Sequence, residues 1–105
     1  MAIPDKVKLG WRIYSVIFGR RSDTPEGNTI WGEIDYERNT IFLNEDGKSG
    51  NQQSTLLHEI IHWIFYNSGQ SKFRQDENLV ECLTNHLMMI FKDNPDLARQ
   101  IFGQE

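Results

Sequence analysis

Two histidines and one glutamate on a short stretch of this chain have the types and spacing that could do chemistry. They form the pentapeptide His58-Glu59-Ile60-Ile61-His62. On an α-helix, side chains four residues apart lie one above the other, so both imidazoles can reach one metal ion. A glutamate beside the first histidine can reach a water on that metal. The spacing therefore predicts two zinc ligands, His58 and His62, and the general base of a hydrolase, Glu59.

The residues around the pentapeptide predict a helix that is buried on most sides. At about 100° per residue, the two histidines and the glutamate fall within one arc of about 100°. Apolar residues of the same segment fill most of the remaining arc: Leu56, Leu57, Ile60, Ile61, Trp63, Ile64 and Phe65. His58, Glu59 and His62 thus share the one polar strip, which favours a metal site over two hydrogen-bonded core histidines.

A zinc ion held by two histidines and a catalytic water needs a third protein ligand. The candidates all lie on the next predicted helix: Asp76, Glu77, Glu81, Cys82 and His86. On a helical wheel Glu77 lies at the edge of the apolar arc, Glu81 lies about 40° further on, and His86 lies on the opposite edge. We expect Glu77 to be the ligand, with Glu81 as an alternative ligand or as the carboxylate that orients a histidine. Cys82 is expected to be a small buried hydrophobe.

Alternating residues and turn signals predict three strands before these helices. Residues 7–18 read as one strand, with Val7, Leu9, Trp11 and Ile13 on one face and Gly10 as a bulge. Residues 29–36 and 40–44 read as two further strands, and their short connection predicts an antiparallel hairpin.

Three helices are expected to follow, at residues 51–67, 76–92 and 95–102. Asn51 or Ser54 could cap the first helix, and residues 70–75 are expected to be a polar connection. Met88 and Met89 are expected in the core. Strands followed by helices predict an α+β fold, with helices on one face of a small three-stranded antiparallel sheet.

Composition predicts one globular domain over residues 1–105. The net charge of −4, without a basic block, argues against a nucleic-acid partner. The single cysteine excludes an internal disulfide and favours a reducing compartment. Neither a signal peptide nor an apolar segment of membrane length is visible. We therefore expect a cytoplasmic protein with no membrane partner, and the oligomeric state stays open.

Taken together, the two long predicted helices resemble a known family. Residues 55–62 resemble the active-site helix of gluzincin-type metallopeptidases, and residues 77–88 are similar to the glutamate helix of the ImmA/IrrE family. In that family the ligand glutamate precedes a small residue by three, and Val80 and Thr84 stand here where alanine is usual. Residues 91–97 are similar to small phage-encoded proteins of this type. The resemblance covers about the C-terminal half of the chain.

The resemblance implies a minimal zincin-like domain and a zinc-dependent peptidase, with His58, His62 and Glu77 as ligands and Glu59 as base. It also implies a protein or peptide substrate, such as a regulator of a phage or mobile element. An edge strand could hold an extended peptide by strand addition. The oxyanion needs a further donor. Four residues could supply it: Tyr36, Tyr66, Arg74 and His86.

Two other interpretations stay open. The first is a zinc-binding module that keeps the zincin fold for protein interaction and does not catalyse a reaction. The second is a helical core with two structural histidines and no metal.

Overall fold

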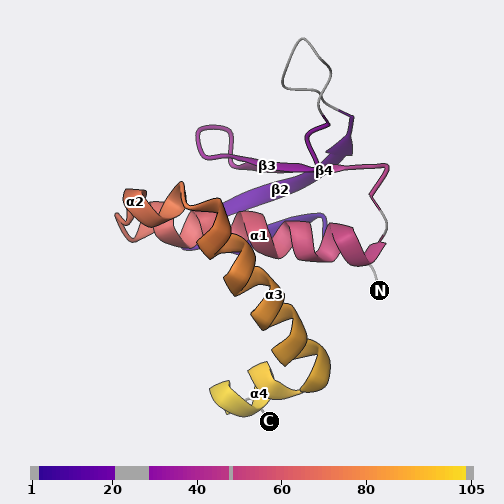
Figure 1. Cartoon of the computed structure of the whole chain (residues 1–105), viewed down its shortest axis with the longest axis vertical. Coiled ribbons are helices and arrows are strands. Elements are labelled where there is room, and N and C mark those ends of the chain that lie inside the picture. Colours follow the sequence, from indigo (N-terminus) through magenta and orange to yellow (C-terminus); the bar gives the residue numbers. More distant parts are fainter. Residues whose placement is uncertain (1–2, 21–28, 48, 104–105) are drawn as a thin grey trace.

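Four strands precede four helices in the computed structural model, which describes residues 3–20, 29–47 and 49–103 (Figure 1). The strands are β1 (Lys6–Leu9), β2 (Arg12–Gly19), β3 (Gly32–Asp35) and β4 (Thr40–Asn44). The helices are α1 (Ser49–Asn67), α2 (Ser71–Arg74), α3 (Glu77–Asp93) and α4 (Leu97–Phe102).

The structure is α+β with a four-stranded mixed sheet, so the predicted three-stranded antiparallel sheet is wrong. The strand order is β1-β2-β4-β3. The β1–β2 and β3–β4 pairs are antiparallel, whereas β2 and β4 run parallel at the centre of the sheet. This order makes β3 an edge strand.

The predicted single strand over residues 7–18 is a hairpin. Leu9 pairs with Arg12, and Gly10 has a φ of 64° in the two-residue loop between them. A positive φ at the first loop residue suits glycine and a tight hairpin, so Gly10 makes a turn and not a bulge. The loop also shifts the alternation: the inward-facing residue is Leu9 before the loop, and Tyr14 and Val16 after it. Trp11 and Ile13, predicted on the same face as Val7 and Leu9, are therefore exposed.

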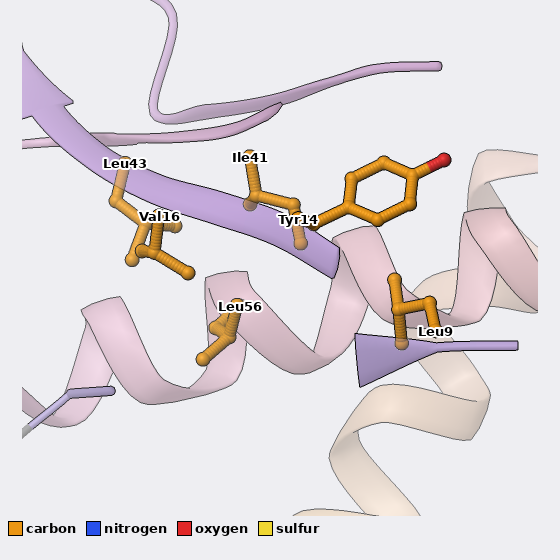
Figure 2. Close-up of a cluster of buried hydrophobic side chains, with 6 residues drawn as sticks. All are labelled: Leu9, Tyr14, Val16, Ile41, Leu43 and Leu56. Atoms are coloured by element: carbon orange, nitrogen blue, oxygen red, sulfur yellow. The ribbon is translucent and has the colours of Figure 1, made fainter. Parts of the chain in front are cut away.

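The core lies between one face of the sheet and α1. Its buried cluster draws on three strands and this helix, and Figure 2 shows the side chains together: Leu9, Tyr14, Val16, Ile41, Leu43 and Leu56. Ile60 and Trp63 of α1 are partly buried and pack against the cluster. This packing fixes α1 across the sheet and turns its polar strip away from the core.

The helix ends follow local chemistry in part. Gly69, with a φ of 75°, lies just past the end of α1, and the Asp76 side chain caps α3 by accepting from the Leu79 N–H at 3.0 Å. The first helix begins at Ser49, before both predicted caps, and α2 lies within the predicted polar connection. Ser54 cannot be the cap, because its hydroxyl donates to the Asn51 carbonyl inside the helix.

Two predictions of burial on α3 are wrong. Cys82 is exposed, and Met89 is more than half exposed. Cys82 is exposed because it lies on the face of α3 opposite to the buried residues Val80 and Thr84. Met89 lies further along the helix, and Figure 1 shows that α3 runs away from the sheet and α1, so its distant part has no neighbouring layer. Among the described residues, no helix combines the length and the apolar character needed to cross a bilayer.

Candidate metal centre

The three predicted ligands lie together between α1 and the start of α3. His58 and His62 stand one turn apart on α1, and Glu77 is the first residue of α3. The two histidine Nε2 atoms are 3.2 Å apart. The Glu77 carboxylate reaches both, with Oε1 2.7 Å from Nε2 of His62 and Oε2 3.2 Å from Nε2 of His58. One potential ligand atom from each residue lies within 4.8 Å of the others.

The two separations of 3.2 Å fit the coordination sphere of zinc, whereas the 2.7 Å between Glu77 Oε1 and His62 Nε2 is a hydrogen-bond distance. Ligand atoms about 2.0–2.1 Å from a tetrahedral zinc are about 3.4 Å from one another. The 3.2 Å between the imidazole nitrogens is close to that value. Two imidazoles and a carboxylate are also the donor set of known catalytic zinc sites, which leave the fourth position open. The residues present therefore fit a zinc ion.

Glu81 contacts the other nitrogen of the His58 ring and is not part of the candidate ligand cluster. Its Oε2 lies 2.9 Å from Nδ1 of His58, on the far side of the ring from the Nε2 that faces His62. A carboxylate at this place holds the proton on Nδ1 and leaves the Nε2 lone pair for a metal. Of the two alternatives that the sequence left open, the geometry favours Glu77 as the ligand.

Packing between α1 and α3 sets the distance from the histidines to the glutamates. Val80 and Thr84 are fully buried, and with Glu77 they form a stripe at helical spacing along α3. The Thr84 hydroxyl donates to the Val80 carbonyl at 2.8 Å, so its polar group is satisfied inside the helix. These modest side chains let α3 approach α1 closely enough for Glu77 to reach both histidines.

Glu59 is buried beside the three predicted ligands, at 7% exposure. Burial raises the pKa of its carboxyl from 4.5 to about 8, and the nearby charges of Glu77 and Glu33 add to the shift. Gly32 of β3 forms the wall opposite this carboxyl. A Cβ at Gly32 would stand 3.2 Å from Oε2 of Glu59 and would overlap the Thr55 methyl group. The absence of a side chain at Gly32 is what allows β3 to lie against α1 here.

An open cleft of about 630 Å³ contains this site. The edge strand β3 forms one wall, α1 the floor, and the start of α3 the other wall. Four carboxylates line it, from Glu33, Glu59, Glu77 and Glu81, and Arg74 is the permanent cation among the described lining residues. The cleft is thus acidic around the ligands, as a cation site requires.

Of the four residues predicted as possible oxyanion donors, two line the cleft and two do not. Tyr36 and Arg74 line the cleft. Tyr36 stacks on Tyr66 with ring centroids 3.8 Å apart, and the Arg74 guanidinium lies 5.5 Å from the Tyr66 ring centroid. Burial raises the pKa of Tyr36 to about 12, so its hydroxyl keeps its proton at neutral pH. His86 lies outside the cleft, bonded at 2.8 Å to the Cys82 carbonyl on the same helix.

Sequence reasoning missed two parts of the site. It did not identify Gly32 as the wall next to Glu59, although a glycine inside a predicted strand is a known signal of close approach. It also missed the stack of Tyr36 on Tyr66, which joins residues 30 positions apart and has no local signature.

Comparisons with protein-family models, with curated proteins and with solved structures give no match. The functional interpretation therefore depends on the geometry of this chain.

Proposed function

We propose that the chain is a zinc-dependent metallopeptidase that hydrolyses a peptide bond of a protein substrate. The observation that carries the proposal is the convergence of His58, His62 and Glu77 within 4.8 Å, with Glu59 buried beside them in an open cleft. Such a cluster has ligands, a base and room for a substrate. The resemblance to the ImmA/IrrE family belongs to this proposal, and so does a phage or mobile-element regulator as substrate.

His58, His62 and Glu77 would hold the zinc ion, and Glu81 would keep His58 in the ligating tautomer. When bound, zinc lowers the pKa of a coordinated water towards about 7, and its positive charge favours the ionised form of Glu59.

Glu59 would act as the general base. Its carboxylate would accept a proton from the attacking water and then deliver it to the nitrogen of the departing amine. The Glu59 side chain extends from α1 towards Gly32 of β3, and its burial there limits its contact with solvent. The same carboxylate would therefore carry out both proton transfers.

The edge strand β3 could hold the substrate as an added strand. The Asn44 N–H donates to the Trp31 carbonyl at 2.9 Å, and bonded pairs alternate along an antiparallel ladder. Gly32 and Ile34 therefore point their backbone N–H and C=O away from β4, and both residues line the cleft. An extended peptide bound to these groups would pass directly over Glu59 and the histidines.

Tyr36 and Arg74 would supply hydrogen bonds to the carbonyl oxygen as negative charge develops on it. Both are donors at neutral pH, since the Tyr36 hydroxyl stays protonated and a guanidinium does not titrate in this range. The stack on Tyr66 keeps the Tyr36 ring in one orientation.

The experiment that tests the proposal compares Glu59→Gln with the wild type. Both proteins are loaded with zinc and incubated with a peptide library made from a bacterial proteome, and new peptide ends are counted by mass spectrometry. We expect Glu59→Gln to keep one zinc per chain and to lose cleavage, whereas Glu37→Gln, an exposed glutamate on the β3–β4 turn, keeps both. Cleavage that survives in Glu59→Gln would refute the role of the base.

A second candidate is a zinc-binding interaction module without catalysis. The observation that favours it is the exposed apolar end of α3 and α4, which hydrolysis does not need. In that case the wild type binds zinc and cleaves no member of the library. Protein without a bound metal, purified with no affinity tag, would exclude both functions.

A further inference from the structure

The C-terminal part of the molecule is an apolar projection away from the candidate metal centre. It covers residues 85–103, which are the second half of α3, the whole of α4 and the residues that follow each helix. We call this part of the molecule the arm. Figure 1 shows it extending away from the sheet and α1. The Cα radius of gyration is 14.4 Å, whereas a compact chain of this length has about 13 Å. The arm therefore lies outside the compact body.

The arm carries large apolar side chains that no other described element of the chain buries. Five of them are exposed: Met89, Ile90, Phe91, Ile101 and Phe102. Ile101 and Phe102 are 64% and 73% exposed, so more than half of each residue's surface contacts solvent. Exposed apolar surface of this extent on a folded domain marks an interaction site. Aromatic residues and methionine are also enriched in the centres of protein interfaces.

The charges of the arm suit contact with a second copy. The arm carries Lys92 and Arg99 against Asp93 and Asp96, so its formal charge is zero while the whole chain carries −4. Two copies of a surface with zero net charge can come into contact without net electrostatic repulsion between them. It also lacks the basic face that draws an amphipathic helix to an anionic membrane. Arg99 is already paired with Asp96 at 3.2 Å, which reduces the cost of burying either charge.

The exposed apolar area of the arm approaches that of a standard interface. At exposures between 39% and 73%, and with roughly 150–250 Å² for a full aromatic side chain and somewhat less for Ile or Met, the five residues present on the order of 500 Å² per copy. A standard interface buries about 800 Å² on each partner, and the polar residues of the same helices can supply the remainder as a rim. Closed twofold symmetry would bring the same arm from both copies together.

We propose that the arm is a homodimer interface, in which α3 and α4 of one copy pack against the same helices of a second copy. The candidate metal centre is at the other end of α3, so each copy keeps its own cleft open.

The test measures the mass of the full chain by sedimentation equilibrium over a series of protein concentrations. We expect the wild type to have twice the mass of one chain, and the double variant Ile101→Glu, Phe102→Glu to have the mass of one chain. The matched control is Trp11→Glu, Ile13→Glu, which places the same charges on two exposed apolar residues of the β1–β2 hairpin. The control should stay dimeric, and circular dichroism should show folded protein in all three.

Three results would overturn the proposal. The first is a wild type with the mass of one chain at every concentration. The second is an arm variant that stays dimeric, and the third is loss of the dimer in the hairpin control. Binding of a monomeric wild type to phosphatidylcholine vesicles would assign the arm to a lipid surface instead.

Discussion

The two halves of α3 carry the same apolar periodicity but have different surroundings. The near half, Glu77–Thr84, lies in the helix that contacts α1; Val80 and Thr84 are buried there, and the glutamates reach His58 and His62. In the far half, Asn85–Asp93, Ile90 and Phe91 are exposed. One amphipathic pattern therefore serves two purposes. The near half builds a site within the chain, and the far half leaves a surface for another molecule.

The difference shows that an apolar stripe predicts a buried face but does not identify what buries it. The near half is covered by the neighbouring helix of its own chain. The far half extends past the end of that contact, and its burial needs a second molecule. Variants that act on one half and not on the other test this division.

The largest expected effect is the loss of a ligand in the near half. We expect Glu77→Ala to weaken zinc binding by more than about 100-fold, because removal of even a residue that orients a ligand costs 10–100-fold. The matched control in the far half is Asp93→Ala, which removes a carboxylate from the other end of the same helix and should not change the affinity. Competition with a chromophoric chelator measures both. Equal affinities in the two variants would contradict the assignment of Glu77.

The second effect is on the pH dependence of stability of the metal-free protein. The pKa of Glu59 is raised from 4.5 to about 8, so the folded state binds more protons than the unfolded state between these values. The free energy of unfolding should therefore fall as pH rises from about 4.5 to 8, by up to a few kcal/mol at about 1.4 kcal/mol per pKa unit. Glu59→Gln should remove this loss and be more stable than the wild type at pH 8. Urea unfolding at a series of pH values checks it, and parallel curves for the two proteins would refute it.

A smaller effect is expected from Glu81, which orients His58. Glu81→Gln should weaken zinc binding by about 10–100-fold, less than Glu77→Ala, because an amide holds the Nδ1 proton less strongly than a carboxylate. The same chelator competition applies. If Glu81→Gln is the more damaging variant, the two glutamates have exchanged roles.

The smallest effect contrasts one apolar residue from each half. Val80→Ala should cost about 2 kcal/mol of unfolding free energy, because it opens a cavity against α1. Ile90→Ala removes a larger side chain from an exposed position and should cost less than about 1 kcal/mol. Urea unfolding is measured in the Ile101→Glu, Phe102→Glu background so that association does not contribute. A larger cost at Ile90 would mean that the far half is buried within the chain.

Local patterns were enough to predict the long helices, but not the sheet. Spacing placed His58, Glu59 and His62 on one strip of α1, and the helical wheel favoured Glu77 among five candidates, with Glu81 as the alternative. The Asp76 cap and the glycine after α1 are features of the same local kind, because their chemistry is confined to a few neighbouring residues.

Non-local pairing explains the errors. Alternation continues on both sides of the loop at Gly10, so residues 7–18 resembled one strand. The change of phase, from Val7 and Leu9 to Tyr14 and Val16, was the signal of a hairpin. The parallel pairing of β2 with β4 and the stack of Tyr36 on Tyr66 join distant residues. No window of the sequence contains either contact.

X-ray absorption at the zinc edge, on tag-free protein loaded with one zinc per chain, tests the metal centre most directly. We expect two imidazole nitrogens and light oxygen ligands at about 2.0–2.1 Å, and loss of one imidazole in His62→Ala. A sulfur ligand at about 2.3 Å, which would come from Cys82, or fewer than two imidazoles in the wild type would contradict it.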